Sequence, residues 1–138
     1  GHVCLLSEAG LIAGDMVAGI GTILIPPGTG DMDVYIEQLQ RLQQLDPHLM
    51  FPSHGPVIPL PQRTLAYYVK HRMERHQRVL DAVDFGLSTV ADISVEDYAN
   101  TPDAHPGLAQ DQTLAHLLSH ERAGRVQQTN KGWIRGDD

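Results

Sequence analysis

The chain has 138 residues, enough for one domain or two small ones, and this length excludes a large multidomain enzyme. Apolar residues make up 41% and charged residues 20%, as in ordinary globular proteins, and the net charge of −7 with neutral histidines disfavours nucleic acid as a partner. The longest apolar stretch, at 17–27, is too short to span a membrane. The single cysteine, Cys4, excludes a disulfide framework and favours a reducing, cytoplasmic compartment.

Two short apolar runs open the chain, at 3–6 and 11–13, and a short polar link that ends in glycine joins them. This pattern predicts a β-hairpin. The second run ends in Gly-Asp, which places the carboxylate of Asp15 at the C-terminal end of a strand, where binding groups gather in layered α/β folds. The glycines and prolines of residues 16–30 then predict an irregular loop with at most a short strand at 22–25.

An amphipathic helix is predicted next, because apolar residues recur at helical spacing from Asp33 to Leu45 and Pro47 stops the run. Asp31 or Asp33 is the expected N-cap. The apolar residues 49–51 then predict a short strand.

A tight loop with the sequence Ser-His-Gly-Pro, at 53–56, follows this strand and puts His54 at a second strand end. Pro59 and Pro61 interrupt the chain shortly afterwards. We therefore expect a domain boundary between residues 61 and 62.

The C-terminal part is expected to be mostly helical. Its predicted elements are a long helix at 65–85 stopped by Gly86, helical segments at 90–93, 95–99 and 108–123, a stop at Gly124, and a hairpin of strands at 125–129 and 132–135. Three helices followed by a two-stranded wing are typical of a winged-helix domain.

The Gly-Asp strand end and the downstream Ser-His-Gly-Pro loop together resemble the metallo-β-lactamase superfamily, and the order of elements looks most like its lactamase-β-like endoribonuclease branch. The resemblance implies an α/β fold class. Residues 1–61 would form the C-terminal half of an αββα metallo-β-lactamase fold, and residues 62–138 a mostly helical, winged-helix-like domain.

The same resemblance implies that Asp15 and His54 are metal ligands, in a site that holds two zinc ions when complete. The family's His-x-His-x-Asp-His cluster is absent from this sequence, which opens Gly-His-Val without an initiator methionine. We therefore interpret the chain as the C-terminal portion of a longer protein, with the missing N-terminal part of the same chain as its partner. Alone, it is expected to be inactive and to bind zinc weakly or not at all, because two ligands are too few.

Two histidine patterns lie on the predicted helices. His71 and Arg72 resemble a His-Arg motif of the family, which implies a role in substrate binding. Alternatively, Arg72, Glu74 and Arg75 belong to a solvated helix face. His116 and His120 are spaced one helical turn apart, which can bind metal, but we expect them to be surface residues.

The sequence therefore favours part of a metal-dependent hydrolase that acts on a small-molecule ester, thioester, lactam or phosphodiester. The alternative is a winged-helix nucleic-acid-binding protein or an RNA-processing nuclease. The predicted helix at 108–123 carries Asp111 and Glu121 against Arg122, a net charge of −1 outside its histidines, so we expect no binding to duplex DNA. We expect Leu114, Leu117 and Leu118 to pack this helix against the helix at 65–85 instead.

Overall fold

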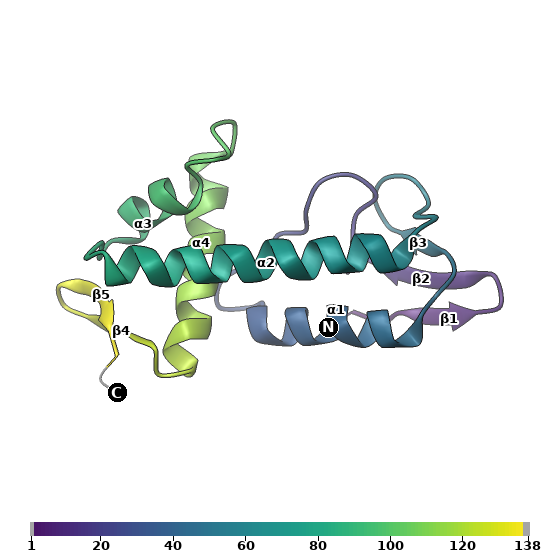
Figure 1. Ribbon diagram of the computed structural model, residues 1–138, viewed down its shortest axis with the longest axis horizontal. Helices are drawn as coiled ribbons and strands as arrows, with labels where there is room; N and C mark the ends of the chain where they lie inside the picture. Colours follow the sequence, from purple (N-terminus) through teal and green to yellow (C-terminus); the bar gives the residue numbers. More distant parts are fainter. Residues whose placement is uncertain (1, 137–138) are drawn as a thin grey trace. The chain divides into compact units, whose positions relative to one another are not determined.

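The structure, a computed structural model, describes residues 2–136 and is drawn in Figure 1. In chain order the elements are β1 (Leu5–Ser7), β2 (Gly10–Gly14), α1 (Met32–Leu45), β3 (Met50–Pro52), α2 (Pro61–Asp84), α3 (Val90–Asp97), α4 (Pro106–Arg122), β4 (Val126–Thr129) and β5 (Gly132–Arg135). This is an α/β chain, as predicted. No helix among the described residues is long and apolar enough to cross a membrane.

The elements divide into two compact units. Unit 1 consists of Gly1–Ile23 and Val34–Arg72, and unit 2 consists of Leu24–Asp33 and Met73–Asp138, so α1 and α2 each contribute to both. The boundary predicted between residues 61 and 62 coincides with the start of α2 and stays a prediction.

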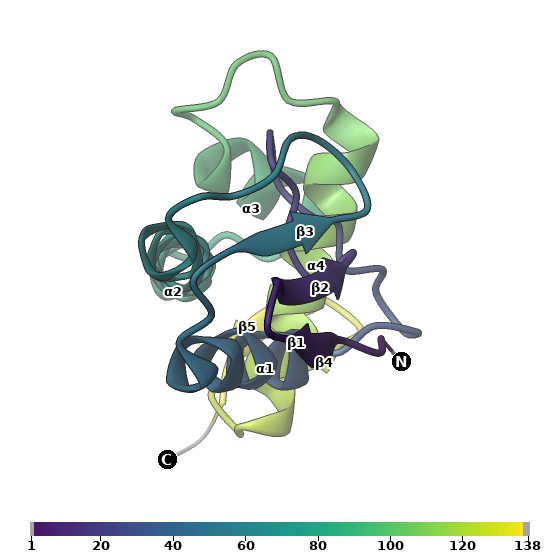
Figure 2. The same cartoon turned by 90° about the vertical axis from the view of Figure 1, so that its right-hand side faces the viewer.

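Unit 1 contains a three-stranded sheet in the order β1-β2-β3, visible in Figure 2. β1 pairs antiparallel with β2 and forms the predicted hairpin, whereas β2 and β3 are parallel, with Leu11 opposite Met50. The carboxyl ends of β2 and β3 therefore meet at one edge of the sheet. There the Ser53 amide donates a hydrogen bond of 2.9 Å to the carbonyl of Gly14.

One face of this sheet is buried and the other is open. Leu11 and Ala13 of β2 are fully buried, together with Met50 of β3, whereas Ile12 is half exposed, as the two-residue alternation of a strand requires. The rest of the unit 1 core comes from side chains of the loop after β2, of α1 and of α2, including Val17, Leu39 and Leu65.

The loop between β2 and α1 contains no strand, so the predicted irregular loop is confirmed and the short strand allowed at 22–25 does not form. The Gln112 side chain hydrogen-bonds both backbone groups of Ile25 in place of a neighbouring strand. The Ile25 amide donates to Gln112 Oε1 (3.1 Å), and the Ile25 carbonyl accepts from Gln112 Nε2 (2.9 Å). At the end of the loop, the amide of Asp33 donates to Asp31 Oδ1 (2.9 Å). Asp31 is therefore the N-cap of α1.

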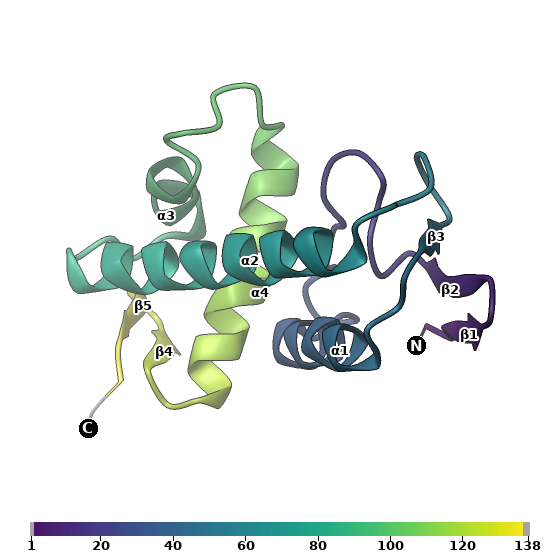
Figure 3. The same cartoon turned by 45° about the vertical axis from the view of Figure 1, so that its right-hand side comes forward.

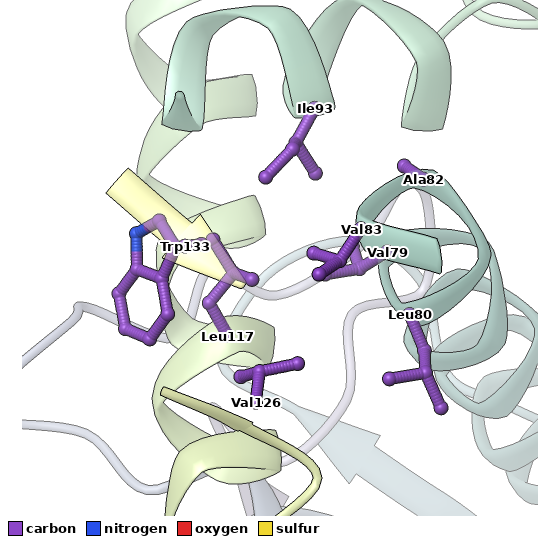
Figure 4. Close-up of a cluster of buried hydrophobic side chains, with 8 residues drawn as sticks. All are labelled: Val79, Leu80, Ala82, Val83, Ile93, Leu117, Val126 and Trp133. Carbon is purple, nitrogen blue, oxygen red and sulfur yellow. The ribbon is translucent and has the colours of Figure 1, made fainter. Parts of the chain in front are cut away.

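Unit 2 has the predicted order of helix, helix, helix and hairpin, shown in Figure 3. α2 ends at a left-handed Gly86 (φ +97°), where the amide of Leu87 bonds the carbonyl of Ala82, and α4 ends in the same way at Gly124 (φ +72°). Figure 4 shows the core that these elements enclose. It consists of Val79, Leu80, Ala82, Val83, Ile93, Leu117, Val126 and Trp133.

The predicted packing of α4 against α2 is confirmed, because Leu117 is completely buried in this core and Leu114 and Leu118 pack against it. Helix α3 is continuous, where two separate helical segments were expected. Its N-cap Thr89 accepts a hydrogen bond of 3.1 Å from the amide of Asp92.

The expectation of a solvated face on α2 is wrong for Arg75, which is 4% exposed. Its guanidinium lies 3.2 Å from the buried carboxylate of Asp97 and 3.5 Å from the ring centroid of Tyr98. Burial raises the pKa of the Asp97 carboxyl, and the neighbouring Arg75 and Arg78 partly offset this effect. A pairing partner on α3, far along the chain, therefore makes burial of the arginine possible.

Candidate metal centre

Asp15 and His54 lie together at the edge of the sheet where β2 and β3 end. Asp15 directly follows β2, and His54 follows β3 by two residues. Their side chains converge, with Asp15 Oδ1 3.4 Å from His54 Nε2. The parallel pairing of the two strands causes this convergence, as a shared site implied by the family resemblance requires.

These two side chains fit part of a zinc ligand set. The His54 side chain is 77% exposed and the Asp15 side chain 48% exposed, yet Asp15 Oδ1 itself is buried and accepts no hydrogen bond from the described residues. An imidazole nitrogen and a carboxylate oxygen are both ordinary zinc donors. Within residues 2–136, no group of three or more His, Cys, Asp or Glu side chains could hold a metal. Asp15 and His54 therefore supply two donors of a site that needs more.

The two loops that carry these donors are joined through their backbones. The amide of Gly19 donates to the carbonyl of His54 at 2.9 Å. A Cβ atom at Gly19 would lie 2.5 Å from the carbonyl oxygen of Pro56, and one at Gly55 would lie 2.9 Å from Gly19 Cα. Gly55 also has a φ of +85°, which L side chains rarely adopt. Glycine is thus required at both positions.

Three side chains from helices fix the loop after Asp15. The Tyr35 hydroxyl donates to the carbonyl of Met16 (2.9 Å), and the Tyr68 hydroxyl donates to the carbonyl of Gly21 (2.8 Å). The amide of residue 18 in turn donates to the Tyr68 hydroxyl (3.0 Å). Burial raises the pKa of both tyrosines, so both stay protonated and able to donate.

Arg72 is the third of these side chains, and the expectation that it lies on a solvated surface is wrong. It is 2% exposed, and its guanidinium donates to the carbonyl of Ile23 and lies over the ring of Tyr35 at 5.5 Å. His71 is half-buried and stacks on Tyr67, with ring centroids 6.0 Å apart and planes at 20°. Substrate binding by His71 and Arg72 stays a prediction.

Nothing in the sequence marks Tyr35 and Tyr68 as residues that fix this loop. Each sits at a regular apolar position of an amphipathic helix, where a tyrosine is indistinguishable from an ordinary core residue. Tyr68 finds its partners 47 to 50 residues away in the chain. The only signal available was that a buried tyrosine hydroxyl requires a hydrogen-bond partner.

A second cluster of titratable groups lies in unit 2, where the expectation of surface histidines is wrong. His116 is fully buried and His120 is 1% exposed. His116 Nδ1 lies 3.2 Å from His76 Nδ1, and the His120 ring stacks on the His76 ring at 3.6 Å. His76 of α2 thus contacts the face of α4 that carries His116 and His120, and the three rings bury one another from water.

Two histidines of this cluster, His76 and His120, have lowered pKa values. Burial is the main cause that lowers the pKa of His76 to about 4, followed by the charges of His120 and Arg125, while Asp33 acts in the opposite direction. Burial likewise lowers the pKa of His120. His76 and His120 are therefore neutral in the folded chain near pH 7.

No family model matches the chain. Among curated proteins, it is 35% identical over 130 residues to the beta-lactamase-like protein 2 homolog of Drosophila melanogaster, covering 91% of this chain and 43% of the relative. It is 31% identical over 84 residues to an atrochrysone carboxyl ACP thioesterase of Aspergillus fumigatus, covering 59% of this chain and 25% of that protein. The chain thus spans less than half the length of both relatives.

Two solved structures share its fold. A beta-lactamase domain protein from Burkholderia ambifaria superposes with a TM-score of 0.84 and 25% identity, covering 98% of this chain and 44% of that one. A metallo-beta-lactamase family protein from Thermus thermophilus superposes with a TM-score of 0.74 and 20% identity, covering 91% of this chain and 41% of that one. The likeness extends over both units.

Proposed function

Since the chain belongs to the metallo-β-lactamase family, we propose that it is the C-terminal portion of a zinc-dependent hydrolase in which Asp15 and His54 are metal ligands. The observation that carries this proposal is the approach of Asp15 Oδ1 to His54 Nε2 at 3.4 Å, at the ends of two parallel strands. Zinc, when bound, supplies a Lewis acid that polarises the bond to be hydrolysed.

The residues of this chain would hold and orient the ligands. Asp15 offers a buried oxygen with no competing hydrogen bond, and His54 offers an exposed imidazole on a loop that the Gly19 amide fixes. The remaining donors would come from the N-terminal part of the longer protein. The isolated chain is accordingly expected to lack hydrolase activity.

A thioester or ester is the substrate class that we favour for the complete enzyme. One relative is named as a thioesterase that acts on an acyl carrier protein substrate. Hydrolysis of a thioester requires an activated water and a polarised carbonyl, both of which a zinc centre provides without a covalent intermediate.

We assign the helical tail to a winged-helix-like domain that serves packing. Its order of three helices and a hairpin supports the assignment, and Leu117 of α4 lies in its closed core. The charged residues of α4 are few, and Arg122 pairs with Asp31 at 3.0 Å and Asp33 at 2.8 Å. A cation that is already neutralised contributes little to phosphate binding.

The test is zinc calorimetry on the full-length protein that contains this chain. We expect two zinc ions per molecule, and we expect Asp15→Asn or His54→Gln to lower the affinity of at least one by about 100-fold. His48→Gln is the matched control, because His48 is exposed and lies outside the site. Equal zinc binding by His54→Gln and His48→Gln would overturn the ligand assignment.

A further inference from the structure

A pocket with a volume of about 370 Å³ opens in unit 1 beside the candidate metal centre. Ala18, Gly19, Gly21 and Thr22 of the loop after β2 line one wall, and Arg63, Thr64, Tyr67 and Tyr68 of α2 line the other. Its size falls within the range of small-molecule sites in proteins. Gly19 belongs to this pocket and also donates to the carbonyl of His54, so the pocket adjoins the loop of a candidate ligand.

The pocket is held in shape by contacts already described. The Tyr68 hydroxyl bonds both Ala18 and Gly21, which ties the loop wall to the helix wall. Gly19 is also packed against the backbone of Pro56 and Gly55 too closely to shift freely. A site whose walls are fixed in advance loses little conformational freedom when a ligand binds.

The charge of the lining has one sign. Arg63 is the only ionic side chain among the lining residues, and among residues 2–136 it makes no hydrogen bond or ion pair. The first turn of α2 carries no acidic residue. In a chain with a net charge of −7, an exposed and unpaired arginine on the lining of a pocket gives that pocket a local positive charge, which favours an anion.

The other lining groups suit an oxyanion attached to a flat body. The hydroxyls of Thr22 and Thr64 can each donate a hydrogen bond to an anionic oxygen. The Tyr67 side chain is 57% exposed, and its stacking on His71 orients the ring. The ring also makes an edge contact with Tyr68, and its exposed part can pack against a planar group of a ligand.

We propose that this pocket binds the carboxylate or phosphate end of the substrate, with Arg63 as the specificity-determining residue and Tyr67 as the platform for an adjoining planar group. This inference rests on the proposed hydrolase function, because that function is what makes the bound anion a substrate. The favoured substrate is thus an ester or thioester that ends in an anionic oxygen group.

The test is titration of the 138-residue chain with phenyl phosphate and, separately, benzoate, followed by amide NMR shifts. Phenyl phosphate and benzoate distinguish phosphate from carboxylate, and inorganic phosphate shows what the ring contributes. We expect saturable shifts at Gly21, Thr22 and Thr64. Arg63→Gln should weaken binding about 10-fold or more, because a hydrogen bond to a charged group is lost. Arg41→Gln, an equal charge change at an exposed position of α1, should leave binding unchanged.

Equal weakening by Arg63→Gln and Arg41→Gln would overturn the proposal, since it would reduce binding to general charge attraction. Absence of saturable shifts at the pocket up to about 50 mM of both aromatic anions would also overturn it. Tyr67→Phe should bind phenyl phosphate like the parent, while Tyr67→Ala should bind it no better than inorganic phosphate. The titration needs neither zinc nor turnover, so its failure leaves the zinc calorimetry of the proposed function untouched.

Discussion

The two units differ in which polar and apolar side chains they bury and which they leave exposed. Unit 2 closes an apolar core of eight side chains and pairs the buried charges of Arg75 and Asp97. Unit 1 leaves Leu5 and Ile12, neighbours across β1 and β2, about half exposed, and it keeps Asp15 and His54 accessible. Unit 1 therefore presents chemical groups at its surface, whereas unit 2 encloses its charged pair within the fold.

The largest expected effect is a cavity in unit 2. Leu117→Ala removes a fully buried side chain from the core, and we expect it to lower the free energy of unfolding by about 2–5 kcal/mol. Urea denaturation measures the change. Leu108→Ala, on the same helix at a side chain that is 44% exposed, should stay within about 0.5 kcal/mol. Equal effects of the two substitutions would mean that the core of unit 2 is not closed.

Acid is expected to destabilise unit 2 through its buried histidines. The unfolded chain binds a proton at His76 near pH 6.5, whereas the folded chain, with a pKa of about 4, does not, so the unfolded state binds more protons between these values. The free energy of unfolding should therefore fall by roughly 3 kcal/mol as the pH drops from about 6.5 to about 4.

Urea denaturation across this pH window is the measurement, and His76→Gln should flatten the dependence. The exposed His48 provides the control, since His48→Gln should retain the full pH dependence. If His76→Gln follows the parent curve, the buried cluster does not carry the acid sensitivity.

Backbone contact in unit 1 should be costly to disturb. Gly55→Ala combines an unfavourable positive φ with a clash against Gly19 and should lower stability by about 2 kcal/mol. Gly21→Ala has nearly the same φ, +83°, but no atom within 4 Å of the added Cβ, so it should cost only about 1 kcal/mol. Thermal unfolding of the two variants measures the difference. If Gly55→Ala lowers stability no more than Gly21→Ala does, the two loops are not in tight contact.

The smallest effect is expected on the open face of the sheet. Ile12→Thr keeps the branched Cβ that strands favour and changes a side chain that is 49% exposed, so stability should change by less than about 0.5 kcal/mol. A loss of several kcal/mol in urea denaturation would mean that this face is covered in solution, by a second copy of the chain or another segment.

Local signals in the sequence predicted much of this fold. The N-cap at Asp31 and the stops at Gly86 and Gly124 depend on neighbouring residues alone, so their patterns can be recognised without tertiary information. The sequence also placed Asp15 and His54 at two strand ends, and the family resemblance implied that they share one site, where the structure brings them within 3.4 Å.

Burial of polar groups could not be predicted in the same way. Arg72 and His116 look like surface residues on a helix until their partners are known, and those partners come from distant segments: the carbonyl of Ile23 for Arg72, and His76 for His116. The pocket beside Arg63 could not be predicted either, because one wall belongs to a loop whose path depends on contacts with distant residues such as Tyr68.

The contact between Gly19 and Gly55 also bears on how a metal would be captured. Because the segments after β2 and β3 touch through their backbones, the Asp15 and His54 donors are held near one another before any ion arrives. An ion that meets donors fixed in this way need not order two loops, so little chain entropy is lost at that step. Asp15 and His54 would thus bind the ion as a rigid pair of donors. The rate of this step would be limited by removal of water from the ion's hydration shell.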